Sequence, residues 1–217
     1  MRLNIGVVLA GGTGNRYGAT IPKQYLMLNG KEVLSYSINT LKRSGVIDCI
    51  IVVCDPMYQD RIKSEYNVEV CNGGDTRNKS VKSVLEYIKA NHNNCENIII
   101  LESARPLCRS KDVLSCIEAL DIYDSVITGQ KIVDSLGCYK SHKCNRDDYY
   151  LIQAPEAFKF HMLYDNFDEN SVLSATCQQM PKDSKLYVYF GLRNNLKITY
   201  FGDIKYIETN LAQELEK

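Results

Sequence analysis

The segment with the clearest chemical character follows the first apolar run of the chain. It reads Leu9-Ala-Gly-Gly-Thr-Gly-Asn-Arg-Tyr-Gly18 and is followed, three residues later, by Pro22-Lys23-Gln-Tyr-Leu26. Three glycines in four residues let the backbone approach a ligand closely, and amides exposed in such a loop can hold phosphate oxygens. The loop therefore predicts an anion site, with a tight strand-to-helix turn and solvated charges as the alternative.

Two common phosphate-binding motifs differ from this loop. The Gly-Lys-Ser/Thr ending of a P-loop is missing, and the dinucleotide fingerprint that would begin with Gly12 and Gly14 has Tyr17 at its third glycine position. The distinctive feature is the pair of cations Arg16 and Lys23, separated by six residues. Two such charges can neutralise a triphosphate and the charge that grows on a departing pyrophosphate.

The overall composition requires such an anion site to be local. The 217 residues carry 26 Lys and Arg against 26 Asp and Glu, with a pI near 6.8, so no global charge favours nucleic acid or an anionic membrane. The longest apolar runs, such as residues 98–101, are far shorter than the ~20 residues of a membrane span, and the start of the chain has no signal-peptide layout. We expect a cytoplasmic protein.

The cysteines and histidines do not have the spacing of a metal site or a disulfide framework. The nine cysteines are scattered singly without a CxxC pair, and His92, His142 and His161 are equally dispersed. In a chain long enough to bury its own core, these cysteines are expected to be reduced, small apolar residues. Zinc and a histidine nucleophile are not expected.

Short β-branched runs alternate with longer amphipathic segments up to residue 128. The runs are mostly apolar, as in strands buried on both faces, and the alternation predicts an α/β fold with a mostly parallel sheet covered by helices on both faces. Strands are expected at 5–9, 49–53, 68–70, 97–101 and 125–128, and helices at 33–43, 57–66, 79–90 and 110–120. Asp55 followed by Pro56 is a typical helix start.

The alternation stops after residue 128. Residues 129–150 are polar, lack a helical period and are too long for a routine turn, so they form either a loose surface loop or an extended arm that packs on a partner subunit. Regular structure is expected again at 151–158, with a helix near 159–167, strands at 186–190 and 196–199 and a closing helix from about Gly202. With no repeat or low-complexity tract, the chain is expected to be a single domain, 1–217.

Six motifs follow one another through nearly the whole chain. They are Ala10-Gly-Gly-x-Gly-x-Arg16 with Pro22-Lys23-Gln-Tyr-Leu26, Gly73-Gly-Asp-Thr-Arg-Asn-Lys-Ser80, Glu102-Ser-Ala-Arg-Pro106, Val133-Asp-Ser135, Arg146 with Gln153-Ala-Pro-Glu-Ala-Phe158, and Asn195-Leu-Lys-Ile-Thr199. In this order they resemble the polyol-phosphate cytidylyltransferase family. That family includes methylerythritol phosphate cytidylyltransferase of isoprenoid synthesis and ribitol phosphate cytidylyltransferase of wall teichoic acid and capsule synthesis.

This resemblance implies a fold and a reaction. The fold is a Rossmann-like nucleotidyltransferase sheet with a projecting arm, residues 129–150, that joins two subunits in a homodimer. In the reaction, which uses Mg²⁺, a phosphate oxygen of a polyol phosphate attacks the α-phosphorus of CTP and yields a CDP-polyol and pyrophosphate. Because the nucleophile is already an anion, charge stabilisation and alignment are sufficient and no activating base is needed.

The resemblance also implies how the nucleotide is bound. Arg16 and Lys23 would hold the triphosphate and Lys197 the α-phosphate, which makes these three cations the catalytic residues. The loop amides around Ala10 and Gly11, together with Gly74, Asp75 and Ser80 of the second glycine segment, would read cytosine. The implied nucleotide-binding residues are Ala10, Gly11, Gly12, Gly14, Gly74, Asp75 and Ser80.

The second substrate and the metal are assigned in the same way. Arg105 would support the polyol phosphate, while Ser135 and Arg146, carried on the arm, would reach the site of the neighbouring subunit. Glu102 would lie beside Mg²⁺, at a position where the family usually has aspartate. The longer side chain must re-aim to reach the same ion.

A further departure concerns the choice of substrate. The family's acidic Thr-Asp-Asp/Glu-Ala segment should fall near residues 172–175, where this chain has no carboxylate. The residues that follow, 175–180, are expected to form an ordinary surface helix. We therefore favour ribitol phosphate or another capsule polyol over methylerythritol phosphate, which is the first alternative. A sugar-phosphate nucleotidyltransferase that uses another base and a nucleotide-binding relic without catalysis are the others.

Overall fold

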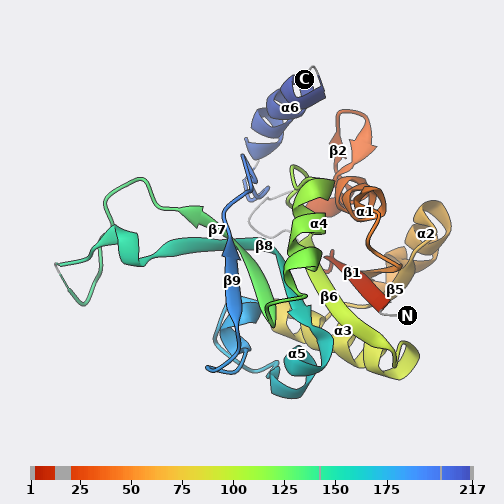
Figure 1. Cartoon of the computed structure of the whole chain (residues 1–217). Helices are drawn as coiled ribbons and strands as arrows, with labels where there is room; N and C mark the ends of the chain where they lie inside the picture. The colour runs from red at the N-terminus through yellow and green to blue at the C-terminus, as the bar shows by residue number, and fades with distance from the viewer. Residues whose placement is uncertain (1–2, 13–20, 142, 201, 216–217) are drawn as a thin grey trace.

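A seven-stranded β-sheet runs through the computed structural model of the chain, which describes residues 3–12, 21–141, 143–200 and 202–215 (Figure 1). Its strands are β1 (Leu3–Leu9), β4 (Cys49–Cys54), β5 (Glu69–Asn72), β6 (Cys95–Glu102), β7 (Ser125–Lys131), β8 (Tyr150–Lys159) and β9 (Leu186–Tyr189). They lie in the order β5-β4-β1-β6-β8-β7-β9. The pairs β5·β4, β4·β1, β1·β6 and β7·β9 are parallel, whereas β8 is antiparallel to β6 and β7. The expected mostly parallel sheet is confirmed.

Helices cover both faces of this sheet. They are α1 (Val33–Ser44), α2 (Pro56–Tyr66), α3 (Arg77–Asn91), α4 (Ser110–Ala119) and α5 (Phe160–Asn166); α6 (Asp203–Leu215) belongs instead to a small separate cluster with Val33 and Ala104. Buried side chains of α1, α2 and α4 form one core cluster with the sheet, and those of α3 and α5 form a second. In the described part of the chain, no helix is long and apolar enough to cross a membrane.

Alternation along β1 divides its side chains between the two cores. Ile5 and Val7 belong to the core under α3 and α5, and Val8 belongs to the core under α1. Gly6 faces α1 at a place where a Cβ atom would lie 2.8 Å from Leu41 Cδ1. The glycine therefore lets α1 pack closely on the central strand.

The start of α2 confirms the helix signal in the sequence. The Asp55 carboxylate accepts a hydrogen bond from the Met57 amide, and Pro56 occupies the first turn, where its missing N–H is of no consequence. This cap fixes the path of the chain directly after β4. The carboxyl end of β4 thereby remains open beside the ends of β1 and β6.

The chain between β7 and β8 projects from the body of the molecule as an extended arm (Figure 1). Its regular structure consists of a 3₁₀ turn at Arg146–Asp148 and a single bridge between Cys138 and Ser141, within the described residues. Val133, Tyr139 and Tyr149 expose large apolar surfaces along it. An extended arm, rather than a loose loop folded back on the surface, is what the structure has.

Three features differ from the sequence-based expectation. Residues 196–199 do not form a strand: the Ile198 amide bonds to the Ala104 carbonyl, but no ladder develops because this segment crosses the ends of the strands. A hairpin of β2 (Met27–Leu28) and β3 (Lys31–Glu32) was not anticipated. Residues 175–180 contain a 3₁₀ turn at Thr176–Gln179, in place of a surface α-helix.

Candidate active site

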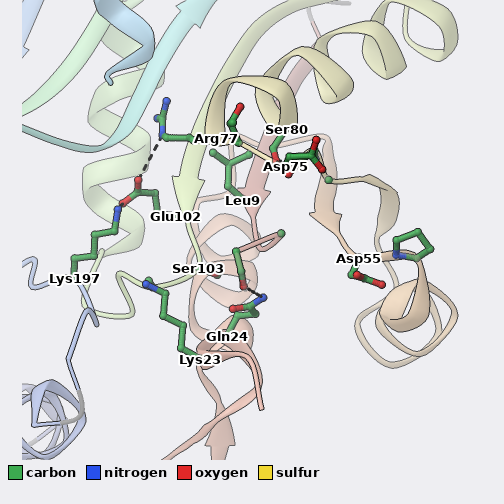
Figure 2. Close-up of a pocket in the computed structure, with 17 residues that line it drawn as sticks. Leu9, Lys23, Gln24, Asp55, Asp75, Arg77, Ser80, Glu102, Ser103 and Lys197 are labelled. Carbon is green, nitrogen blue, oxygen red and sulfur yellow. Dashed lines mark hydrogen bonds and ion pairs between the residues drawn. The ribbon is translucent and has the colours of Figure 1, made fainter. Parts of the chain in front are cut away.

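A pocket of about 450 Å³ opens at the carboxyl ends of β1, β4, β5 and β6 (Figure 2). This edge of an open α/β sheet is where ligands ordinarily bind. Figure 2 shows Lys23, Lys197 and Glu102 on one side of the pocket and Asp55, Asp75 and Ser80 on the other. The lining residues are Leu9, Gly11, Gly12, Lys23, Gln24, Asp55, Pro56, Gly73, Gly74, Asp75, Thr76, Arg77, Ser80, Glu102, Ser103, Ala104 and Lys197.

Two glycine segments form the floor of this pocket. A Cβ atom on Gly11 would lie 3.5 Å from the Gly73 Cα, so the loops after β1 and β5 are nearly in backbone contact. At Gly74, a Cβ would lie 2.4 Å from the Lys79 Cβ, which excludes any larger residue. The Gly74 amide donates to Ser80 Oγ at 3.0 Å. Of the predicted nucleotide-binding residues, Gly11, Gly12, Gly74, Asp75 and Ser80 are thus brought together.

The predicted loop is held in place by a residue that was not singled out from the sequence. Gln24, in the 3₁₀ turn Lys23–Tyr25, donates through its side-chain amide to the Ala10 carbonyl at 2.6 Å and to the Gly12 carbonyl at 3.0 Å. Ala10 is buried beneath the loop and does not line the pocket. The sequence does contain a signal for Gln24, because this residue directly follows the predicted cation Lys23 in the Pro-Lys-Gln motif.

The N-terminus of α3 faces the same pocket. Thr76 caps the helix by accepting a hydrogen bond from the Lys79 amide, and Arg77 and Ser80 of the first turn line the pocket. The free amides and dipole of a helix N-terminus favour anions. Arg77 was quoted only as part of a motif, although it contributes one of the pocket's cations.

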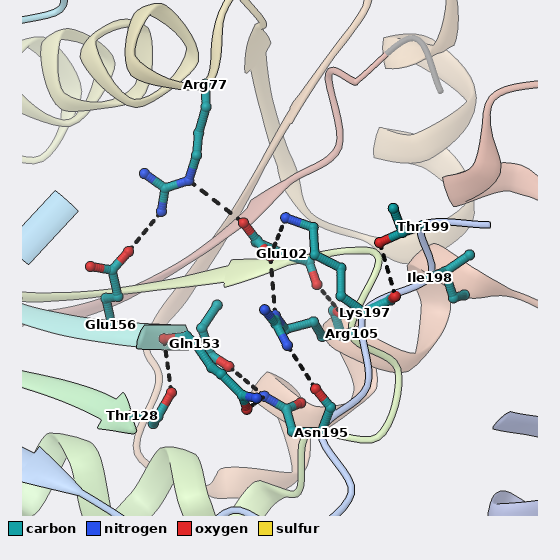
Figure 3. A network of polar contacts seen from close by, with 12 residues as sticks. Arg77, Glu102, Arg105, Thr128, Gln153, Glu156, Asn195, Lys197, Ile198 and Thr199 are labelled. Atoms are coloured by element: carbon teal, nitrogen blue, oxygen red, sulfur yellow. Dashed lines mark hydrogen bonds and ion pairs between the residues drawn. The ribbon is translucent and has the colours of Figure 1, made fainter. Parts of the chain in front are cut away.

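One carboxylate gathers the cations at the end of β6. Glu102 Oε2 lies 2.9 Å from Lys197 Nζ and 3.1 Å from Arg105 Nε, and Oε1 lies 3.6 Å from Arg77 Nε (Figure 3). Lys23 joins them from another direction, with its Nζ donating to the Ile198 carbonyl at 2.8 Å. Lys23, Lys197 and Glu102 therefore line the same pocket.

The cations decide the ionisation of Glu102. Burial alone raises the pKa of its carboxyl, but the charges of Lys197, Arg105 and Arg77, together with the hydrogen bond from Lys197, outweigh burial and lower the pKa to about 2. Glu102 is consequently an anion at any physiological pH.

A second polar layer supports this cluster. Arg77 also bonds Glu156 Oε1 at 2.7 Å, and Arg105 donates to the Asn195 carbonyl at 2.7 Å (Figure 3). Asn195 in turn donates to Gln153 Oε1 and to the Ala154 carbonyl. Arg105 lies behind Glu102 and is absent from the pocket lining, so within this chain it orients the cluster.

A second pocket, of about 430 Å³, adjoins the first and shares Thr76 and Arg77 with it. Glu169, Ser171 and Ser174 are among its lining residues. A carboxylate therefore stands near the segment 172–175 after all, three residues before Val172. Val172 itself is almost fully exposed.

The remaining predicted residues are not brought to the pocket in a single chain. Arg146 contacts the Val133 carbonyl and lies 3.9 Å from Asp147, on the arm that carries Ser135 as well. The arm leaves the sheet at the carboxyl end of β7 and projects from the body of the molecule (Figure 1). Arg16 and Gly14 lie outside the described residues.

A Rossmann-like sheet with glycine loops and clustered cations at its carboxyl edge defines a nucleotidyltransferase. The family model of 2-C-methyl-D-erythritol 4-phosphate cytidylyltransferase matches residues 5–213. The chain belongs to this family; it is a CTP-using nucleotidyltransferase that acts on a polyol phosphate.

Individual relatives agree with this assignment. The chain is 25% identical over 228 residues to the ribitol-5-phosphate cytidylyltransferase of Lacticaseibacillus paracasei, covering 96% of the chain and 97% of that protein. It is 30% identical to the bifunctional enzyme IspD/IspF of Pelagibacter ubique, where the match covers 92% of the chain and only 55% of the relative. The structure of 4-diphosphocytidyl-2C-methyl-D-erythritol synthase from Anaerococcus prevotii superposes with a TM-score of 0.84 at 26% identity, over 97% of the chain and 96% of that structure.

The charge on Glu102 leads to a prediction about acid stability. A carboxyl whose folded-state pKa lies below its unfolded value stabilises the fold above the unfolded pKa, and the stabilisation disappears as pH falls from about 4.5 towards 2. We expect Glu102→Gln to lower the free energy of unfolding at pH 7, by on the order of 3 kcal/mol. The difference in the free energy of unfolding between wild type and Glu102→Gln should narrow as pH falls from 5 to 2. Urea unfolding at each pH measures this difference. Glu65→Gln, which removes an exposed ion pair, is the control and should change the free energy of unfolding only slightly at every pH. If the difference between wild type and Glu102→Gln stayed constant from pH 5 to 2, the lowered pKa assigned to Glu102 would be wrong.

Proposed function

We propose that the chain transfers a cytidylyl group from CTP to ribitol phosphate or a closely related polyol phosphate, with release of pyrophosphate. The observation that carries this proposal is the cluster of Lys23, Arg77 and Lys197 next to the glycine loops. The cations and the helix N-terminus suit the triphosphate, and the Gly74 segment, on the opposite side of the pocket, suits the base.

The proposed reaction is a direct displacement. An oxygen of the polyol phosphate forms a bond to the α-phosphorus of CTP, the bond from that phosphorus to the bridging oxygen breaks, and pyrophosphate leaves with the electron pair. Lys197 would neutralise the α-phosphate, while Lys23 and Arg16 would stabilise the charge that develops on pyrophosphate. The attacking phosphate needs no base because it is already ionised.

The donor set at the pocket suits Mg²⁺. Magnesium in nucleotide sites is typically held by one or two carboxylates together with substrate phosphates, and Glu102 supplies a carboxylate that stays ionised. When nucleotide phosphates draw Lys197 away, an oxygen of Glu102 would become available to the ion. The metal would add positive charge at the phosphates.

We propose that cytosine is read by the backbone near Gly74. The exocyclic amine of the base would donate to carbonyl groups there, a contact that uracil cannot make. Ser80 supports the recognition indirectly, because its hydroxyl is bonded to both the amide and the carbonyl of Gly74. Asp75, whose side chain is largely exposed, lies at the rim of the same segment.

The second pocket is the proposed polyol subsite. It adjoins the phosphate cluster through Arg77, and Ser171, Ser174 and Asn170 offer neutral hydrogen-bonding groups for uncharged hydroxyls. Glu169 is the single acidic residue among its described lining residues. The substrate would then be held chiefly through its phosphate, by Ser135 and Arg146 of a second subunit, while Arg105 orients the cluster from behind Glu102.

The first test concerns Lys23. We expect Lys23→Ala to reduce kcat/KM for Mg²⁺-dependent pyrophosphate release from CTP by on the order of a hundredfold, because one preorganised charge at the transition state is lost. Lys31→Ala, which removes an exposed lysine of β3 outside the pocket, should retain wild-type turnover. The role of Lys23 would be refuted if Lys23→Ala kept wild-type turnover with every polyol phosphate that the enzyme accepts.

The second test identifies the polyol. Ribitol, methylerythritol and glycerol phosphates are compared side by side with CTP, and with the other three nucleoside triphosphates in its place. We expect the highest kcat/KM with CTP and ribitol phosphate. A methylerythritol phosphate kcat/KM tenfold above the others, about 1.4 kcal/mol of transition-state preference, would reverse the choice of substrate.

The third test concerns the arm, which we propose as a dimerisation element. Val133, Tyr139 and Tyr149 expose apolar surface on a projection that makes few contacts with its own subunit, as expected if a second subunit covers it. Mixing Arg146→Ala protein with Lys23→Ala protein should restore part of the activity, because one site in a mixed dimer receives both intact residues. A monomer at assay concentration, measured by light scattering, would end this proposal.

A further inference from the structure

Three potential metal ligands meet at the opposite edge of the sheet from the active-site pocket. Cys49 is the first residue of β4, Glu69 is the first residue of β5, and His92 caps the C-terminus of α3. All three are partly buried, so their side chains are held by the protein while an ion can still reach them. They come from separate elements, which is why no short spacing in the sequence reveals them.

The three ligand atoms already converge on one point. Cys49 Sγ, a carboxylate oxygen of Glu69 and a ring nitrogen of His92 all lie within 4.8 Å of one another. Cys49 Sγ is 3.4 Å from Glu69 Oε1, and His92 Nε2 is 2.8 Å from Glu69 Oε2. Ligands on a tetrahedral zinc ion lie roughly 3.3–3.8 Å apart, given bonds of about 2.0–2.3 Å. Small side-chain rotations would therefore suffice to admit an ion.

We propose that Cys49, Glu69 and His92 form a zinc site, with water as the fourth ligand. One sulfur, one nitrogen and one oxygen donor match the borderline softness of Zn²⁺, whereas Mg²⁺ and Ca²⁺ prefer oxygen donors alone. The ion would displace the Cys49 thiol proton to solvent, and the His92 ring would carry its proton on Nδ1 so that Nε2 could bind the ion.

The surroundings of the cluster support this assignment. The Tyr87 hydroxyl donates to Glu69 Oε2 at 3.0 Å and so orients the carboxylate, as outer hydrogen bonds commonly do for metal ligands. Zinc deprotonates a coordinating thiol outright, so Cys49 would bind the ion as its thiolate.

The role of such an ion would be structural. Helix α3 has 15 residues and spans about 22 Å, with its N-terminus at the active-site pocket and His92 at its other end. A zinc ion at His92 would tie that end of α3 to β4 and β5. It would stabilise the strands and the helix that carry the pocket without touching substrate. Its effect on stability can therefore be measured separately from the effect of Mg²⁺ on activity.

Zinc titration of the chelator-treated full-length protein tests the site. We expect isothermal titration calorimetry to detect binding at this site and Tm to rise by about 5 °C or more at a hundredfold excess of zinc over its Kd. Cys49→Ser and His92→Gln should lose one equivalent of bound zinc and the rise in Tm. Cys138→Ser and His161→Gln, matched changes outside the cluster, should retain both. Pyrophosphate release with Mg²⁺ should be unchanged in Cys49→Ser.

Two outcomes would overturn the proposal. One is the absence of zinc binding by the wild-type protein; the other is equal zinc binding by wild type and a folded Cys49→Ser protein, with folding checked by circular dichroism. If Cys49→Ser does not fold, the test uses the absorption spectrum of bound Co²⁺ in a protein that carries Cys138→Ser and Cys144→Ser. This protein should show a thiolate-to-cobalt charge-transfer band, and adding Glu69→Gln should weaken the band. Absence of the band would refute the site.

Discussion

The active-site pocket depends on the charge balance around Glu102. Three cations approach this one carboxylate from three separate segments: Arg77 from the start of α3, Arg105 from the turn after β6, and Lys197 from the segment near the C-terminus. Two like charges 4 Å apart repel by about 4 kcal/mol near a protein surface, so three cations could not gather there without an anion. Glu102 holds them together before any phosphate arrives. The free energy needed to order the cations is thus spent when the chain folds and not when the substrates react. Electrostatic preorganisation requires this.

The sheet and the glycine loops determine where this cluster points. β6 ends at Glu102, between β1 and β8, so the carboxylate emerges at the middle of the strand order. Beside it, Gly11 and Gly73 bring two loops nearly into backbone contact, which leaves no side chain to cover their floor. Gln24 fixes one of these loops by binding two of its carbonyl groups. Cations therefore occupy one side of a cavity whose floor is glycine backbone.

Local patterns in the sequence were sufficient for the elements of the fold but not for the contacts of the site. The mostly apolar strands and the Asp55-Pro56 helix start are local signals, and the structure has them as predicted. Residues 196–199 have a strand-like pattern but form no strand, because their neighbours are the turn after β6 and Lys23 rather than a sheet edge. The structure brings Lys23 and Lys197 from the predicted motifs to one pocket, whereas the roles of Gln24 and Arg77 depend on partners distant in sequence. For Ser135 and Arg146, which lie on the arm, a single chain provides no pocket partner at all among the described residues.

Two glutamates of the site are connected through Arg77. It lies between Glu102 and Glu156, 3.6 Å from the first and 2.7 Å from the second. An aspartate at 102 would end about one carbon–carbon bond earlier, so its carboxylate would lie farther from Arg77 and Lys197 at the same backbone position. Glu156 also accepts hydrogen bonds from the amides of Thr176 and Cys177, at the 3₁₀ turn that follows the segment bordering the second pocket. A change in charge at either glutamate therefore acts on the phosphate cluster and on the proposed polyol subsite at once, which physically couples the two halves of the reaction.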